Sequence, residues 1–105
     1  MGRAQERVLQ AIANGRRYGF EIMVAAGMSS GAVYQALAGL ERGGYVRSRW
    51  EDPDIAERAR RPRRRYYAIS RSGEHALAEV AERYRAFQRD MPARFSTDPG
   101  YDTTA

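Results

Sequence analysis

The segment 28–45 (MSSGAVYQALAGLERGGY) constrains the fold most, because its apolar and small residues separate onto two sides of a helix. Steps of three and four residues place one set on a single apolar stripe: Val33, Ala36, Leu37 and Leu40. The opposite face carries Gly31, Gln35, Ala38 and Arg42, with Tyr34 on its flank. Ser29 or Ser30 can cap the first turn, and Gly43-Gly44 can end the last. We therefore predict a helix with one buried face and one open face.

Two shorter helical segments precede this helix, over residues 3–14 and 18–26. The apolar face of the first is formed by Val8, Leu9 and Ile12, and Asn14-Gly15 should end it. The second is expected to supply Phe20, Ile22 and Met23 to the core. Two short helices joined by a glycine turn, the second amphipathic, form the helix-turn-helix pattern.

A β-hairpin is predicted next, with strands over residues 45–51 and 65–70. The first strand alternates, with Arg47 and Arg49 on the side opposite Val46, Ser48 and Trp50. The charged segment 52–64 between the strands is expected to be a loop at the hairpin tip. A hairpin after a helix-turn-helix is a wing. We expect Trp50 to pack at its base, with stacking on a ligand as the alternative.

Ser70 can cap a last helix that runs to about Asp90. Its apolar side chains alternate between steps of three and four, which is the heptad pattern of a helix–helix seam. They are Leu77, Val80, Tyr84, Phe87 and Met91. The seam could dock on the domain's own core, but one short domain cannot cover all of its turns, so we predict dimerisation. Residues 1–71 would then form the winged domain, 72–91 the dimerisation helix and 92–105 a polar, disordered tail.

Charge and composition limit the classes of partner and of reaction that are expected for this chain. The 105 residues carry a net charge of +5, and every one of the 18 basic residues is arginine. This excess favours a polyanion, either nucleic acid or an anionic membrane. No apolar run is long enough to span a membrane and no signal pattern opens the chain, so we expect a cytoplasmic protein. The chain has no cysteine, a single histidine (His75) and no carboxylate pair in an apolar context. We therefore predict no metal, no cofactor and no enzymatic activity.

With these segments laid out, the chain resembles the PadR family of winged-helix transcriptional regulators. Each of four short segments resembles a family motif: the opening of the second helix, the recognition helix, the wing and the entry to the last helix. In this chain they are 17–22 (RYGFEI), 30–42 (SGAVYQALAGLER), 61–67 (RPRRRYY) and 70–73 (SRSG). The resemblance implies a mainly α winged helix-turn-helix with a small β-hairpin. It also implies repression of a nearby promoter, sometimes relieved by a small phenolic or drug-like ligand.

Four positions depart from the family pattern. Gln35 stands where the family usually has proline, which adds a side chain able to pair with a base. Ala38 and Gly39 replace two residues that are often basic, and Arg60 replaces the usual wing glycine. The resemblance also implies a dimer built through the last helix, often with the first, which would place Val8 and Ile12 at the interface.

These patterns predict a homodimer that places the helix 28–45 in the major groove of double-stranded DNA. The expected DNA contacts are Ser29, Ser30, Gly31, Tyr34 and Gln35 on the helix and Arg60, Arg61, Arg63 and Arg64 on the wing. Arg65 is expected to be structural, and Glu51, Asp52 and Asp54 could fold back on the arginines without DNA. Two alternatives stay open: a module that senses small aromatic molecules, with Tyr84 and Phe87 as candidate pocket residues, and a winged-helix adaptor for an acidic protein.

Overall fold

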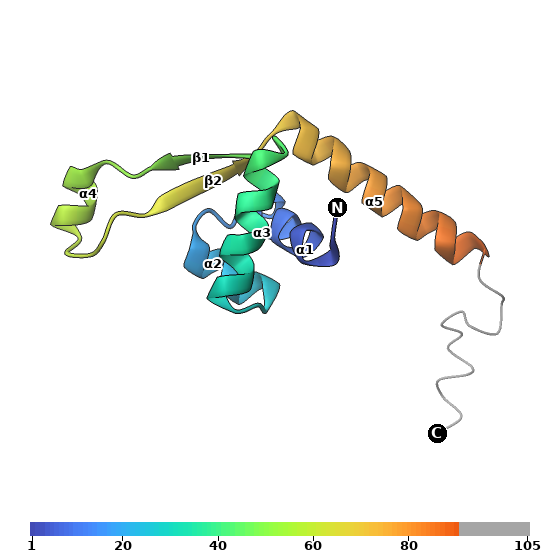
Figure 1. The fold of residues 1–105 in the computed structure, drawn as a ribbon, viewed down its shortest axis with the longest axis horizontal. Coiled ribbons are helices and arrows are strands. Elements are labelled where there is room, and N and C mark those ends of the chain that lie inside the picture. The colour runs from blue at the N-terminus through green and yellow to red at the C-terminus, as the bar shows by residue number, and fades with distance from the viewer. Residues whose placement is uncertain (91–105) are drawn as a thin grey trace, which may run out of the picture.

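A computed structural model describes residues 1–90, so Met91 and the predicted disordered tail lie outside the described residues. The fold is mainly helical, with a two-stranded antiparallel hairpin between the third helix and the last. Its elements are α1 (Arg3–Ala13), α2 (Gly19–Ala26), α3 (Ser30–Arg42), β1 (Val46–Trp50), α4 (Pro53–Arg58), β2 (Arg65–Ile69) and α5 (Arg71–Asp90). The hairpin and α5 extend in opposite directions from a body made by the first three helices (Figure 1).

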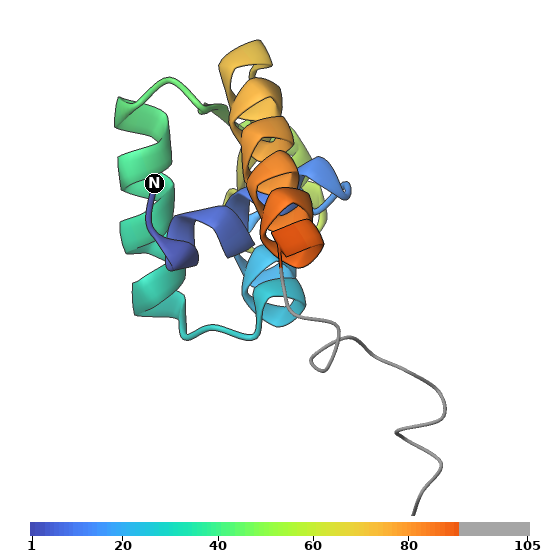
Figure 2. The same ribbon diagram turned by 90° about the vertical axis from the view of Figure 1, so that its right-hand side faces the viewer.

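The body is held by one apolar core beneath α3. The predicted stripe of α3 is buried there against α1, whose Val8 and Leu9 are fully covered. In the end-on view α1 lies between α3 and α5, with its axis across theirs (Figure 2). Val8 and Ile12 are 0% and 5% exposed within this single chain, so their predicted place in the dimer interface is wrong. They face inward because α2, α3 and β2 close over α1.

Short-range signals set the ends of the helices. Ser29 caps α3 by accepting a hydrogen bond from the N–H of Ala32 at 3.2 Å. Gly27 ends α2 with a φ of 65°, a left-handed conformation that glycine adopts without a Cβ clash. The predicted place of Phe20 in the core is wrong, because Phe20 is 63% exposed, whereas Ile22 is buried as predicted. Within residues 1–90 no single helix is long and apolar enough to cross a membrane; α2 and α3 pass that test only together, across a 108° bend.

The hairpin forms as predicted, but its tip is not a loop. Val46 pairs with Ile69 next to the body, and Trp50 pairs with Arg65 at the far end of the ladder. The tip contains α4, which begins because Asp52 accepts a hydrogen bond from the N–H of Asp54 at 2.9 Å and Pro53 suits a first helical turn. Trp50 lies at the outer end of β1 and is 52% exposed, so its predicted packing at the base of the wing is wrong.

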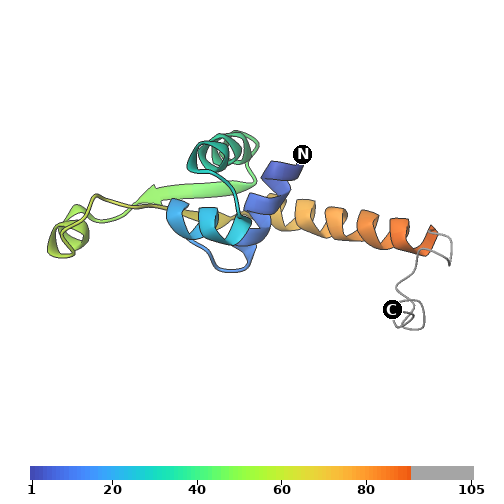
Figure 3. The same cartoon turned by 90° about the horizontal axis from the view of Figure 1, so that it is seen from below.

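The last helix packs on the body at its start, and further along it Arg83 forms an ion pair with Glu6 of α1 at 3.5 Å. Ser70 accepts a hydrogen bond from the N–H of Gly73 at 3.1 Å, and a Cβ at Gly73 would clash with the carbonyl oxygen of Tyr45. Leu77 packs partly against the core. Beyond it α5 leaves the body, as the view from below shows (Figure 3), and Tyr84 and Phe87 are 62% and 61% exposed.

Candidate nucleic-acid interface

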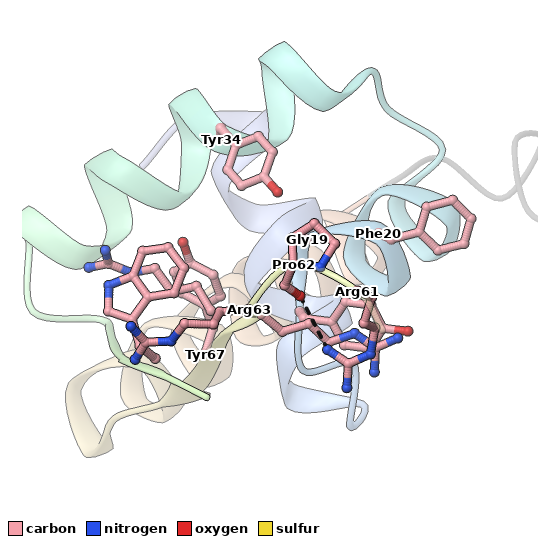
Figure 4. A pocket seen from close by; sticks show the side chains of 11 residues that line it. Gly19, Phe20, Tyr34, Arg61, Pro62, Arg63 and Tyr67 are labelled. Carbon is pink, nitrogen blue, oxygen red and sulfur yellow. Dashed lines mark hydrogen bonds between the residues drawn. The ribbon is translucent and has the colours of Figure 1, made fainter. Parts of the chain in front are cut away.

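The open face of α3 is the first part of the candidate interface. All five predicted contact residues there are exposed: Ser29, Ser30, Gly31, Tyr34 and Gln35. Burial of the opposite stripe fixes the rotation of the helix and so turns this face outward. The close-up shows Tyr34 pointing from α3 toward Gly19 at the start of α2 (Figure 4). A Cβ at Gly19 would clash with the Tyr34 hydroxyl, so the missing side chain makes room for that ring.

Glu41 holds the wing against the last turns of α3. Its carboxylate accepts hydrogen bonds from the hydroxyl of Ser48 and, at 3.3 Å, from Nη2 of Arg65. The Nε of Arg65 also donates to the Ser48 hydroxyl at 3.0 Å. These bonds join a residue of α3 to both strands of the hairpin. They fix where the wing lies relative to the open face, and Arg65 is structural, as expected.

Glu51 is the second anchor, at the point where β1 ends. Glu51 is only 3% exposed. Its carboxylate accepts hydrogen bonds from the Arg61 guanidinium at 2.6 and 2.9 Å and from the Tyr66 hydroxyl at 3.0 Å. The backbone N–H of Arg64 also donates to it, at 3.3 Å. The Arg61 hydrogen bond, against the opposing effect of burial, lowers the pKa of Glu51 to about 2. Of the three acidic residues expected to fold back on the arginine run, Glu51 does so. The prediction is wrong for Asp52, which caps α4, and for Asp54, which forms no ion pair among residues 1–90.

The pairing with Glu51 corrects the predicted role of Arg61. Both terminal nitrogens of its guanidinium donate to the same buried carboxylate, and this pairing raises the pKa of Arg61 further above its ordinary value. A guanidinium engaged in this way has its charge neutralised and its planar edge occupied. We therefore reassign Arg61 from DNA contact to holding the wing.

The other three predicted wing arginines are not paired with an acidic side chain in residues 1–90. Arg60, Arg63 and Arg64 form no ion pair with any residue in the range 1–90. The guanidinium of Arg63 lies 5.5 Å from the centre of the Trp50 ring, and that of Arg64 lies 4.0 Å from the centre of the Tyr18 ring. Arg63 and Arg64 line the same cavity as Tyr34, whereas Arg60 lies with Asp54 and Glu57 near the wing tip.

The far side of the hairpin carries a basic surface that the prediction of DNA contacts omitted. The guanidinium groups of Arg17 and Arg49 lie 4.7 and 5.5 Å from the centre of the Tyr66 ring. Arg47 is exposed on the same face of β1 as Arg49. The alternation of β1 in the sequence indicates that Arg47 and Arg49 share this face, because it places them on the side opposite Val46. Nothing in the local sequence brings Arg17 to them.

The family comparison agrees with this arrangement of recognition helix and wing. The model of the transcriptional regulator PadR-like family matches residues 8–79. The chain belongs to this family. Among curated proteins, none matches its sequence. As a PadR-like protein, it has the fold and family of transcriptional regulators, which are generally not enzymes.

Solved structures show the same fold at low sequence identity. A PadR family transcription regulator from hypervirulent Clostridium difficile R20291 has a TM-score of 0.73 and 19% identity, over 84% of this chain and 93% of that one. A transcriptional regulator from Clostridium thermocellum has a TM-score of 0.64 and 22% identity, over 82% and 84%. A mutant MepR from S. aureus has a TM-score of 0.73 and 14% identity, over 97% and 72%.

Proposed function

We propose that this PadR-like regulator is a sequence-specific DNA-binding repressor that acts as a homodimer on an inverted-repeat operator. The observation that carries the proposal is the open face of α3, which lies beside a wing whose Arg63 and Arg64 keep their charges. The two carboxylate anchors hold these parts in one arrangement before any DNA is bound. A pre-formed surface of this kind loses little conformational freedom on binding.

The side chains of the open face divide into those that read bases and those that hold phosphates. Gln35 can pair with both hydrogen-bonding groups of an adenine edge in the major groove. Gly31 and Ala38 are small, so the helix can come close to the duplex. Tyr34, Ser29 and Ser30 can donate hydrogen bonds to phosphates, and Arg63 and Arg64 neutralise phosphates or enter the minor groove.

The dimer is proposed from the exposed apolar side chains in the second half of α5. Tyr84 and Phe87 are exposed beyond the point where Leu77 packs on the body, and Val80 continues the same heptad stripe. Pairing of this stripe with its copy would remove large apolar side chains from water. It would also set two α3 helices about 10 base pairs apart, or a multiple of that, on an inverted repeat.

Selection of bound sequences from a random duplex pool at stated salt tests the proposal directly. We expect an inverted repeat, with two protein chains bound per duplex. A double variant with Tyr84→Glu and Phe87→Glu should sediment as a monomer and lose the two-site pattern. A native chain that sediments as a monomer, or a selected site without a repeat, would refute the dimeric reading.

The wing arginines are tested by the salt dependence of binding. Replacing Arg63 and Arg64 with alanine removes four arginines from the homodimer, so it should weaken binding to all sequences and reduce the slope of log K against log salt by about 3.6, or about 0.9 for each phosphate that is no longer neutralised. Arg85→Ala, at an exposed arginine on α5, is the control and should leave the slope unchanged.

Sequence preference is tested at Gln35. Gln35→Ala should reduce the preference for the selected sequence more than it reduces binding to random DNA. If no duplex is bound even at low salt, the adaptor alternative is favoured.

A further inference from the structure

The face of the hairpin that is turned away from α3 carries a cluster of arginines around one tyrosine. Cross-strand pairing places two residues of β1 and two of β2 on this face. The segment before α2 joins them, because the N–H of Tyr67 donates to the carbonyl oxygen of Arg17 at 2.7 Å. We call this face the outer surface, and it consists of Arg17, Arg47, Arg49, Tyr66 and Ala68.

The guanidinium groups of the outer surface are held in place but not neutralised. Those of Arg17 and Arg49 lie against the Tyr66 ring, a contact that orients a cation and leaves its charge unpaired. The ring is itself fixed, since its hydroxyl donates to the buried carboxylate of Glu51 at 3.0 Å. Within residues 1–90, Arg17, Arg47 and Arg49 form no ion pair.

The outer surface encloses a shallow hollow of about 150 Å³, and no residue that lines it in the described range is acidic. Two carboxylates contact its margins, but both accept hydrogen bonds from other groups. Glu21 accepts one from the backbone N–H of Arg17 at 3.0 Å, and Glu51 is paired with Arg61. An anion in the hollow would therefore meet three guanidinium groups that are free to donate hydrogen bonds to it.

The outer surface faces away from the DNA contact proposed for α3. The pleat of β1 turns Ser48 the opposite way, and its hydroxyl donates to Glu41 of α3. Arg47 and Arg49 therefore point away from α3, which lies on one side of the hairpin in the view from below (Figure 3). A duplex against the open face of α3 would lie across the sheet from these arginines, so an anion bound to them belongs to a different segment of DNA or to a different molecule.

The composition of the outer surface favours nucleic acid over a protein or a membrane. None of the large apolar side chains that are exposed in residues 1–90 belongs to it. Protein interfaces depend on such side chains as anchors, and a membrane surface holds a protein through inserted apolar groups. Interfaces with DNA are instead polar and strongly positive. The Tyr66 ring already carries guanidinium groups, so it is a poor platform for the stacked bases of a single strand.

We propose that the outer surface binds the phosphates of a second segment of double-stranded DNA, without reading its sequence. A chain whose α3 holds an operator would then hold another duplex, or a distant part of the same one, on its opposite side. This bridging alone rests on the proposed function. The contact between DNA and the outer surface does not require α3 to recognise any sequence.

The test uses single cysteines, because the chain has none of its own. Ala68→Cys reports on the outer surface, Ala38→Cys on the open face of α3 and Ala81→Cys on α5, and all three alanines are exposed. Each variant is alkylated with N-ethylmaleimide at low salt, with and without a short duplex of random sequence. At about 100 μM duplex we expect the modification of Ala68→Cys to slow about tenfold, since non-specific binding at low salt should have a Kd of about 10 μM. Ala81→Cys should be modified at the same rate with and without DNA.

Bridging is measured by capture of a second duplex. A biotin-labelled duplex with the selected sequence holds the protein on beads, and a fluorescent duplex of random sequence is then added. The native chain should retain the second duplex. Arg47→Ala with Arg49→Ala should retain about tenfold less of it. Arg85→Ala with Arg89→Ala removes the same charge from exposed positions on α5 and should retain as much as the native chain.

A further variant guards against loss of the fold. Arg47 is exposed and its guanidinium lies on no ring, so Arg47→Glu should keep the hairpin intact and still reduce capture. The cysteine measurements are made on chains that keep every arginine, so they decide the matter even if an arginine variant fails to fold.

Several results would overturn the proposal. One is an unchanged rate for Ala68→Cys at the highest DNA concentration, and another is native capture by the double variant at positions 47 and 49. Slowing by polyglutamate at a lower concentration than by DNA would make the outer surface a site for an acidic protein instead. If DNA slows Ala68→Cys but not Ala38→Cys, the outer surface binds DNA and the function proposed for α3 fails. The reverse pattern overturns only the proposal for the outer surface.

Discussion

The recognition helix and the wing are held in place by different forces. The inner face of α3 is fixed by apolar burial, with Val33, Leu37 and Leu40 at most 1% exposed. The hairpin is fixed by two carboxylates, Glu41 and Glu51, which accept hydrogen bonds from side chains on or beside the strands. Apolar burial does not depend on the ionisation of a side chain, whereas an ion pair weakens with salt and is lost when its carboxylate is protonated at low pH. The position of the wing should therefore depend on salt and on low pH more than the position of the helix does.

The wing also shows that one residue type can have two roles within five positions. Arg61 and Arg65 pair with buried or partly buried carboxylates, while Arg63 and Arg64 lie on aromatic rings with their charges unpaired. A cation on a ring is held in place but keeps its field toward solvent. The first pair holds the wing, and the second pair keeps its positive charge toward solvent.

The largest expected effect comes from the apolar side of the comparison. Leu37→Ala should lower the free energy of unfolding by about 2–5 kcal/mol, because it removes buried methyl groups and leaves a cavity. Chemical denaturation followed by circular dichroism measures this. Gln35→Ala, on the exposed face of the same helix, is the control and should stay within about 0.5 kcal/mol of the native chain. Equal losses in the two variants would contradict the burial assigned to α3.

A smaller and more local effect is expected on the wing. Glu51→Gln leaves the Arg61 guanidinium without its charged partner, so the segment around α4 should open more often. Trypsin should cleave the chain after the arginines of residues 58–65, except at the Arg61–Pro62 bond, about tenfold faster. The midpoint of global unfolding should move less than in Leu37→Ala. Glu57→Gln changes an exposed acid on α4 and should leave cleavage at the native rate. Faster cleavage in that control would show that the loss of negative charge, not the loss of the anchor, opens the wing.

The pH dependence of the wing follows from the same carboxylate. Since the pKa of Glu51 is lowered from 4.5 to about 2, its stabilising effect is fully present above about pH 4.5 and is lost as the pH falls toward 2. Trp50 is next in sequence to Glu51, so its indole NMR signal should report this loss. The Glu51→Gln chain should lack the part of the change that falls in this window. An identical titration in both chains would place the transition elsewhere.

The smallest predicted effect concerns Arg60, which has a φ of 56°. A side chain in this left-handed region costs about 1–2 kcal/mol, a penalty that glycine avoids. Arg60→Gly should therefore stabilise the wing by up to about 1 kcal/mol, after the greater freedom of glycine in the unfolded chain is counted. Hydrogen exchange of the amides around residues 59–61 should slow about fivefold, whereas Arg60→Ala should bring no such slowing. Equal exchange in the two variants would argue against strain at this position.

The order of the main elements could be predicted from the sequence because it depends on local patterns. Steps of three and four residues marked the buried stripe of α3, alternation marked β1, and Ser29 marked a helix start through a hydrogen bond only three residues long. The Asp52-Pro53 start of α4 is an equally local signal, which the prediction of a loop at the tip overlooked. Signals of this kind hold whatever the helix or strand later packs against.

Only the tertiary structure decided which apolar and charged side chains are covered. Phe20 and Ile22 are equally apolar in sequence, yet the core closes over Ile22 and leaves Phe20 in the cavity wall. The partner of Arg61 lies ten residues away across the hairpin, so no local pattern distinguished it from Arg63. Burial and pairing depend on what other segments bring to a position, which is why the sequence alone could place the helices and strands but not assign each side chain its partner.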